Sequence, residues 1–113
     1  MSDFKTTWTQ KELSAYLLLY CANVDYIESE EEVEMIRAKV DPAEYKSIHK
    51  EFEHDNDYQS IQKIQAAVER LGLSKTHIDI MIAEMKALFV ADGEFDATEH
   101  ALFNGIKKLL EEQ

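Results

Sequence analysis

The stretch from Thr9 to Val24 reads TQKELSAYLLLYCANV and decides the class of fold. Its centre, from Tyr16 to Ala22, is apolar around nearly the whole circumference of a helix. A surface helix carries a single apolar stripe, so a helix of this composition belongs in the interior. Thr9 is a residue type that commonly caps a helix start. We therefore predict a helix over residues 10–24 in the middle of the fold.

Apolar residues continue at helical spacing to the end of the chain, and no segment shows the period of two that is typical of strands. Five further helices are predicted to start at Ser29, at Asp41 followed by Pro42, at Asp57, after Ser74 and after Asp96. Their apolar positions, expected to face the core, are Val33, Ile36 and Val40, then Tyr45, Ile48 and Phe52, then Ile61, Ile64, Val68 and Leu71, then Ile78, Ile80, Met81, Ile82, Met85, Leu88, Phe89 and Val90, and finally Leu102, Phe103, Ile106, Leu109 and Leu110. The prediction is an all-α compact bundle of about six helices, in which the two most apolar helices, the first and the fifth, are partners.

The charge of the chain limits what it can bind. Its 113 residues contain 12 Lys and Arg against 23 Asp and Glu, a formal net charge of −11. This field repels nucleic-acid phosphates and anionic lipid, and the basic residues are scattered along the sequence. No stretch approaches the roughly 18 apolar residues of a membrane span. We expect a cytoplasmic protein with no nucleic-acid partner and no membrane insertion, built as one domain over 10–113 after an N-terminal arm over 1–9.

Two features near the N-terminus each allow two interpretations. Cys21, the one cysteine, lies in the apolar segment, which favours a buried, inert thiol over a redox role. Phe4 and Trp8 are aromatic residues outside the helical pattern. The arm that carries them either folds back onto the bundle or is exposed to a partner or a second subunit.

Acidic segments follow the two most apolar helices. Residues 25–32 align with 92–99 without a gap, which places Glu32 on Glu99, so the chain is predicted to contain a pseudo-twofold internal repeat. Carboxylates cluster in both segments, and hard divalent cations bind oxygen clusters of this kind. The candidate metal ligands are Asp92, Asp96 and Glu99 in the second segment and Asp25 and Glu32 in the first. Ca²⁺, Mg²⁺, Mn²⁺ and Zn²⁺ are not distinguished by this pattern.

Helix capping offers a second explanation for several of these carboxylates. Ser29 with Glu32, and Asp96 with Glu99, have the spacing of a capping box, which needs no metal. Capping does not require Asp92, and clustered carboxylates repel one another unless a cation relieves the repulsion. Both interpretations stay open at this point.

Residues 91–99, ADGEFDATE, resemble the Ala-Asp-Gly-x-hydrophobic-x-x-x-Glu signature of the TerB-like family, the tellurite-resistance and DjlA N-terminal type of helical domain. Residues 24–32 resemble the first of the family's two paired copies, with Tyr26 where the family usually has glycine. The resemblance spans roughly residues 13–110. It implies two pseudosymmetric helical halves with an acidic face that binds a divalent cation, in a bacterial cytoplasmic stress-response or signalling protein. Asp92 and Glu99 match the acidic positions directly, and Asp25 and Glu32 match them in the first copy.

Catalytic signatures are missing from the sequence. We find no nucleophile with a convincing base, no phosphate-binding glycine-rich loop and no pair of histidines with zinc-protease spacing, so we predict that the protein is not an enzyme. His100 follows Glu99 directly, and His49 with Glu53 has the i, i+4 spacing of a metal pair on a helix face. Solvated side chains are the ordinary explanation for both.

Two functional hypotheses follow. The first is a TerB-like, non-enzymatic acidic module that binds a divalent cation through its paired acidic segments. The alternative is a metal-independent helical interaction module whose acidic face docks a basic protein partner, with a homodimer through the N-terminal arm as one form of it.

Overall fold

The computed structural model describes residues 8–23, 30–90 and 97–111, with the backbone alone at 97–99. Its helices are α1 (Gln10–Ala22), α2 (Glu30–Arg37), α3 (Pro42–His54), α4 (Asp57–Leu71), α5 (Lys75–Val90) and α6 (Ala97–Glu111). No strand occurs within these ranges, so the all-α prediction with six helices is confirmed. The Cα radius of gyration, 13.0 Å, is that of a folded domain of this size. Among the described helices, none has the length and apolar character needed to cross a membrane.

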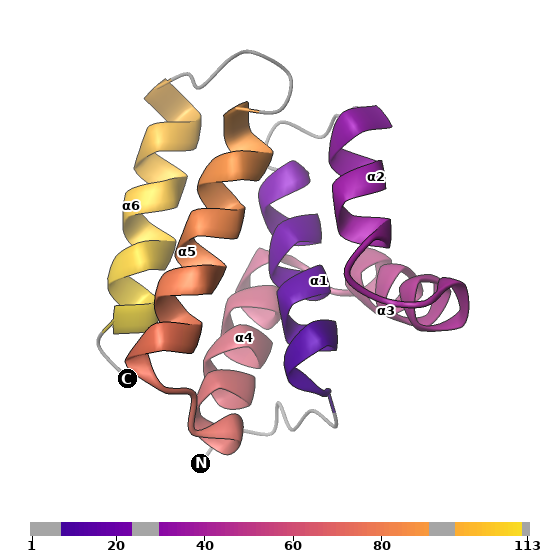
Figure 1. Ribbon diagram of the computed structural model, residues 1–113, viewed down its shortest axis with the longest axis horizontal. Helices are drawn as coiled ribbons and strands as arrows, with labels where there is room; N and C mark the ends of the chain where they lie inside the picture. The colour runs from indigo at the N-terminus through magenta and orange to yellow at the C-terminus, as the bar shows by residue number, and fades with distance from the viewer. Residues whose placement is uncertain (1–7, 24–29, 91–96, 112–113) are drawn as a thin grey trace.

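The first helix occupies the middle of the molecule, as its apolar sequence predicts. In Figure 1, α1 stands between α5 and α2, and it packs against α2, α3, α4 and α5. Every residue from Leu13 to Leu19 is buried. The helix ends at Ala22, two residues before the predicted end, with Asn23 as its C-cap. A helix with neighbours on all sides can bury its whole circumference, and this is why α1 needs no polar face.

The fifth helix packs against α1 and α6, which confirms the predicted pairing of the two most apolar helices. Its burial is one-sided, however. Met81 and Met85 are buried, whereas Ile80 is 50% exposed and Val90 is 46% exposed. The two helices therefore occupy different environments although their sequences are similarly apolar. The pseudo-twofold repeat stays a prediction.

Capping boxes begin three of the helices. Thr9 pairs with Glu12 at α1, Asp41 with Glu44 at α3, and Asn56 with Gln59 at α4. In each case the cap side chain accepts from the third backbone N–H of the helix while the third side chain accepts from the cap's own N–H. These local bonds explain why the helix starts were predictable from the sequence.

Gly72 ends α4 in the left-handed conformation, with φ 58° and ψ 47°. A Cβ added at Gly72 would meet nothing within 4 Å, so the cost of a side chain there is backbone strain. We expect Gly72→Ala to lower the free energy of unfolding by about 1 kcal/mol. The matched control is Gly105→Ala in the interior of α6, where a Cβ also has open space, and which should raise stability by about 0.5 to 1 kcal/mol. Urea unfolding of both variants measures the difference, and equal effects would contradict the strain argument.

Candidate functional site

The predicted cation ligands fall largely on residues outside the described ranges. Asp25, Asp92 and Asp96 are outside them, and so is the side chain of Glu99. Glu32 is the one predicted ligand whose side chain is described. It lies in the first turn of α2 and is 5% exposed.

Burial of Glu32 distinguishes it from the other acidic residues of its helix and from the capping glutamates. Glu30 and Glu31, its neighbours in the first turn of α2, are exposed. Glu12 and Glu44, which complete the capping boxes of α1 and α3, are both partly exposed. Burying a carboxylate costs free energy unless opposite charge or hydrogen bonds compensate for the lost water. Glu32 is therefore the most deeply buried of these five glutamates.

The described helix ends that flank the two acidic segments lie at one end of the bundle. In Figure 1, the C-terminal ends of α1 and α5 and the N-terminal ends of α2 and α6 lie together at the top of the view. Residues 24–29 connect the first pair of ends and residues 91–96 connect the second pair. The described residues on either side of both segments thus lie at the same end of the molecule.

Cys21 lies in the last turn of α1 and is 1% exposed. Burial raises the pKa of its thiol, and the negative charge of Glu32 raises that pKa further. A thiol with a raised pKa carries little thiolate at neutral pH and reacts slowly. The predicted buried cysteine is confirmed.

A partly buried polar network beneath α1 was missed by the sequence analysis. The Tyr16 hydroxyl donates to Asp55 Oδ2 at 2.6 Å and lies 3.0 Å from Ser60 Oγ. Lys63 Nζ lies 2.9 Å from Asp55 Oδ2 and 2.7 Å from Glu51 Oε2. These residues come from α1, from α3 and its C-cap, and from α4, so the network joins three helices. We interpret it as structural because its carboxylates are already paired.

The network also holds the described end of the N-terminal arm. Trp8 is 4% exposed, its Nε1 donates to Glu51 Oε1 at 3.2 Å, and its backbone carbonyl accepts from Arg70. Its ring lies 4.3 Å from that of Tyr16, centroid to centroid. At this residue the arm folds back onto the bundle. Phe4 lies outside the described residues.

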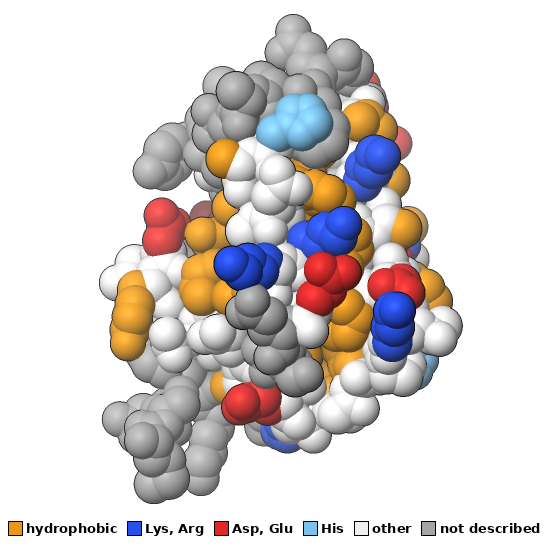
Figure 2. Space-filling view, turned by 90° about the vertical axis from the view of Figure 1, so that its left-hand side faces the viewer, with side chains coloured by type: hydrophobic (Ala, Val, Ile, Leu, Met, Phe, Trp, Pro, Cys, Tyr) orange, Lys and Arg blue, Asp and Glu red, His pale blue; other side chains and the backbone are white. Residues whose placement is uncertain are grey.

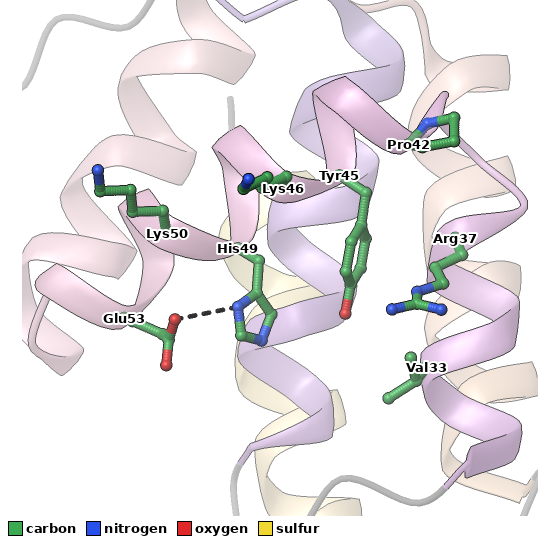
Figure 3. Close-up of a pocket in the computed structure, with 8 residues that line it drawn as sticks. All are labelled: Val33, Arg37, Pro42, Tyr45, Lys46, His49, Lys50 and Glu53. Carbon is green, nitrogen blue, oxygen red and sulfur yellow. Dashed lines mark ion pairs between the residues drawn. The ribbon is translucent and has the colours of Figure 1, made fainter.

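A candidate binding site is a groove of about 850 Å³ between α2 and α3. Its lining residues are Val33 and Arg37 from α2, and Pro42, Tyr45, Lys46, His49, Lys50 and Glu53 from α3 (Figure 3). Val33 was predicted to be buried but is only half-buried, because it lies at the edge of this groove. Pockets that hold organic ligands have volumes in this range.

Three cationic side chains line this groove, namely Arg37, Lys46 and Lys50, and all three residues are exposed. Among the described residues, no carboxylate lies within ion-pair distance of any of them. Lys39 and Lys63, by contrast, are paired with carboxylates. The packing of α2 against α3 thus brings together basic residues that are separated in the sequence. The spacing of Lys46 and Lys50, one helical turn apart, was the available signal.

The face that carries α6 has a different character. Figure 2 shows basic and acidic side chains next to one another there, between small groups of apolar side chains. Opposite charges that alternate in this way cancel at short range and leave no local field of one sign. The groove between α2 and α3 therefore stands out as a basic feature of an acidic protein.

The histidine candidates do not form a metal site in the described part of the chain. His49 Nδ1 lies 3.1 Å from Glu53 Oε1, so the predicted i, i+4 pair forms as an ion pair on α3. His54, at the end of α3, and His100, in the first turn of α6, are exposed. Across residues 8–23, 30–90 and 97–111, no three His, Cys, Asp or Glu side chains are close enough to hold a metal ion.

No protein-family model, curated protein or solved structure matches the chain. The TerB-like resemblance therefore rests on the motif residues alone.

Proposed function

We propose that this protein is a non-enzymatic helical module that binds a divalent cation at the end of the bundle where its two acidic segments attach. The proposed ligands are Asp92, Asp96, Glu99, Asp25 and Glu32. Burial of Glu32 is the observation that supports this proposal best, because it holds the carboxylate of one proposed ligand out of bulk water at this end of the bundle. The arrangement of the helix ends, with both acidic segments attached at one end, is consistent with a shared site. The bacterial stress-response or signalling context follows from the TerB-like resemblance, as does the pseudo-twofold arrangement.

The test is the thermal melt of chelator-treated protein, compared with Ca²⁺, Mg²⁺, Mn²⁺ and Zn²⁺. A cation that binds the folded state at about 100 times its Kd adds roughly 2.7 kcal/mol of stability. For a domain of this size the midpoint should rise on the order of ten degrees. We expect this rise to be lost when Asp92→Asn is combined with Glu99→Gln.

A matched control is Glu30→Gln with Glu31→Gln. These exposed residues of α2 remove the same amount of negative charge close to the same end of the bundle. The control should keep the full rise with the ion that stabilises the unmodified chain. A rise that survives in the Asp92 and Glu99 variant would contradict the proposed ligands. If none of the four ions moves the midpoint, the cation proposal is wrong and the alternative, an acidic face that docks a basic protein, takes its place.

A further inference from the structure

We propose that the groove between α2 and α3 binds an acidic peptide segment of a partner protein, with Arg37, Lys46 and Lys50 contacting the carboxylates of that segment. This site is distinct from the proposed cation site. It is lined by described residues of α2 and α3, and its ligand has the opposite charge.

Local charge is the first argument. Arg37, Lys46 and Lys50 are exposed, and none has a carboxylate partner in the described part of the chain. Among the described lining residues Glu53 is the one acidic residue, and its carboxylate contacts His49. Solvent ions screen surface charges beyond about 8 Å at physiological ionic strength. A ligand in the groove therefore responds to these three cations more than to the net charge of −11.

The spread of the cations argues for a peptide rather than a compact anion. Figure 3 shows Arg37 reaching from α2 on one side of Tyr45, while Lys46 and Lys50 project from α3 on the other side. The three charged groups do not converge on a single point, as they would around one phosphate. The groove volume of about 850 Å³ is also far larger than a phosphate needs. Carboxylates distributed along a peptide match this arrangement.

Apolar surface lies between the cations, so a ligand must match it as well as the charges. Val33 and Tyr45 are half-exposed in the groove, and Pro42 is exposed beside them. The guanidinium of Arg37 lies 5.0 Å from the centroid of the Tyr45 ring, and the His49 ring lies 5.5 Å from it at an angle of 32°. The Tyr45 ring thus forms one side of the groove, and its contacts with Arg37 and His49 fix its orientation. We expect the preferred peptide to carry an apolar side chain between its carboxylates.

The test is fluorescence polarisation with a labelled peptide in which pairs of glutamates flank one leucine, titrated with the full chain in chelator. We expect saturable binding that weakens as salt is raised. Charge reversal by Lys46→Glu with Lys50→Glu should lower the affinity roughly tenfold, because each surface contact contributes up to about 1 kcal/mol. The matched control is Lys86→Glu with Lys108→Glu. These exposed residues make the same change in net charge, and their helices, α5 and α6, lie on the opposite side of α1 from α2 (Figure 1).

Several outcomes would overturn the proposal. These are no binding by the unmodified chain, equal losses in the groove and control variants, and equal binding of a peptide with glutamine in place of glutamate. Displacement by inorganic phosphate at equal concentration, or tighter binding of a single-stranded oligonucleotide, would instead assign the groove to another anion. Amide shifts of Val33 and Tyr45 on peptide addition locate the site without any mutation, and shifts confined to other helices would contradict it. Retention of the cation response by the groove variant would show that the two proposed sites are separate.

Discussion

Replacing Asp55 with alanine should lower the free energy of unfolding by about 3 kcal/mol. The Asp55 side chain is 8% exposed, accepts a hydrogen bond from the Tyr16 hydroxyl and pairs with Lys63. Its removal leaves the Tyr16 hydroxyl with Ser60 as its remaining partner, and it leaves Lys63, 18% exposed, paired with Glu51 alone. Losing one member of a desolvated charge pair is costly because the other member cannot regain its water.

Urea unfolding measures this effect, with Asp79→Ala on α5 as the control. Asp79 is exposed and should change stability by no more than about 0.5 kcal/mol. Tyr16→Phe should cost about 1 kcal/mol, and its combination with Asp55→Ala should be non-additive because the two residues share a hydrogen bond. An Asp55→Ala effect as small as that of the control would show that the network contributes little to the fold.

The second large effect is a loss of stability at alkaline pH. Burial raises the pKa of the Cys21 thiol above its ordinary value of 9.0. Above that pH the unfolded chain loses the thiol proton while the folded chain keeps it, so deprotonation favours the unfolded state. Each pH unit above 9.0 costs about 1.4 kcal/mol for as long as the folded thiol keeps its proton.

Tyr16 and Lys63 act in the same direction. Burial, and then the hydrogen bond to Asp55, raise the pKa of Tyr16 above its ordinary value of 10.0, so the unfolded chain ionises first there too. For Lys63, burial alone would lower the pKa, but the bonds to Glu51 and Asp55 outweigh it and the pKa is raised. The stability that Lys63 contributes is present below its ordinary pKa and is lost as pH rises through the folded value. The thiol therefore weakens the fold above pH 9.0, and Tyr16 and Lys63 add to this loss above their ordinary pKa values of 10.0 and 10.5.

Urea midpoints measured between about pH 7 and pH 11 test this prediction. Cys21→Ala should flatten the decline that begins near pH 9, and Tyr16→Phe should flatten the part above pH 10. Tyr58→Phe is the control, because Tyr58 is 66% exposed. A decline that is unchanged in both buried-site variants would contradict the assignment of these groups.

The predicted helices agree with the structure because their signals are local. Asp41 and Pro42 start α3, and Gly72 ends α4, through bonds and dihedral angles within a few residues of each position. The exposure of single positions was less predictable. Val33 was placed in the core with Ile36, yet Val33 lines the groove and Glu32 is buried. Which side of a short helix faces the core depends on neighbours that are distant in sequence.

The candidate sites also differ in whether their residues are close together or far apart in the sequence. The acidic segments, their candidate ligands Asp92 and Glu99, and the resemblance to a known family were visible as runs of residues. The groove was not, because Arg37 lies on a different helix from Lys46 and Lys50. The network around Asp55 was missed for the same reason, since Tyr16 and its partner Ser60 lie 44 positions apart in the chain.

The sequence by itself determined the class of fold, the number of helices among the described residues, where most of them start, and which helix lies in the middle. Apolar spacing and caps act within one turn of helix and need no distant partner. The tertiary structure alone decided that α1 buries its whole circumference while α5 exposes Ile80. It also decided that three cations share one groove in a protein with an excess of acidic residues. Such features depend on which helix surfaces face each other, and that is fixed by the packing of the whole chain.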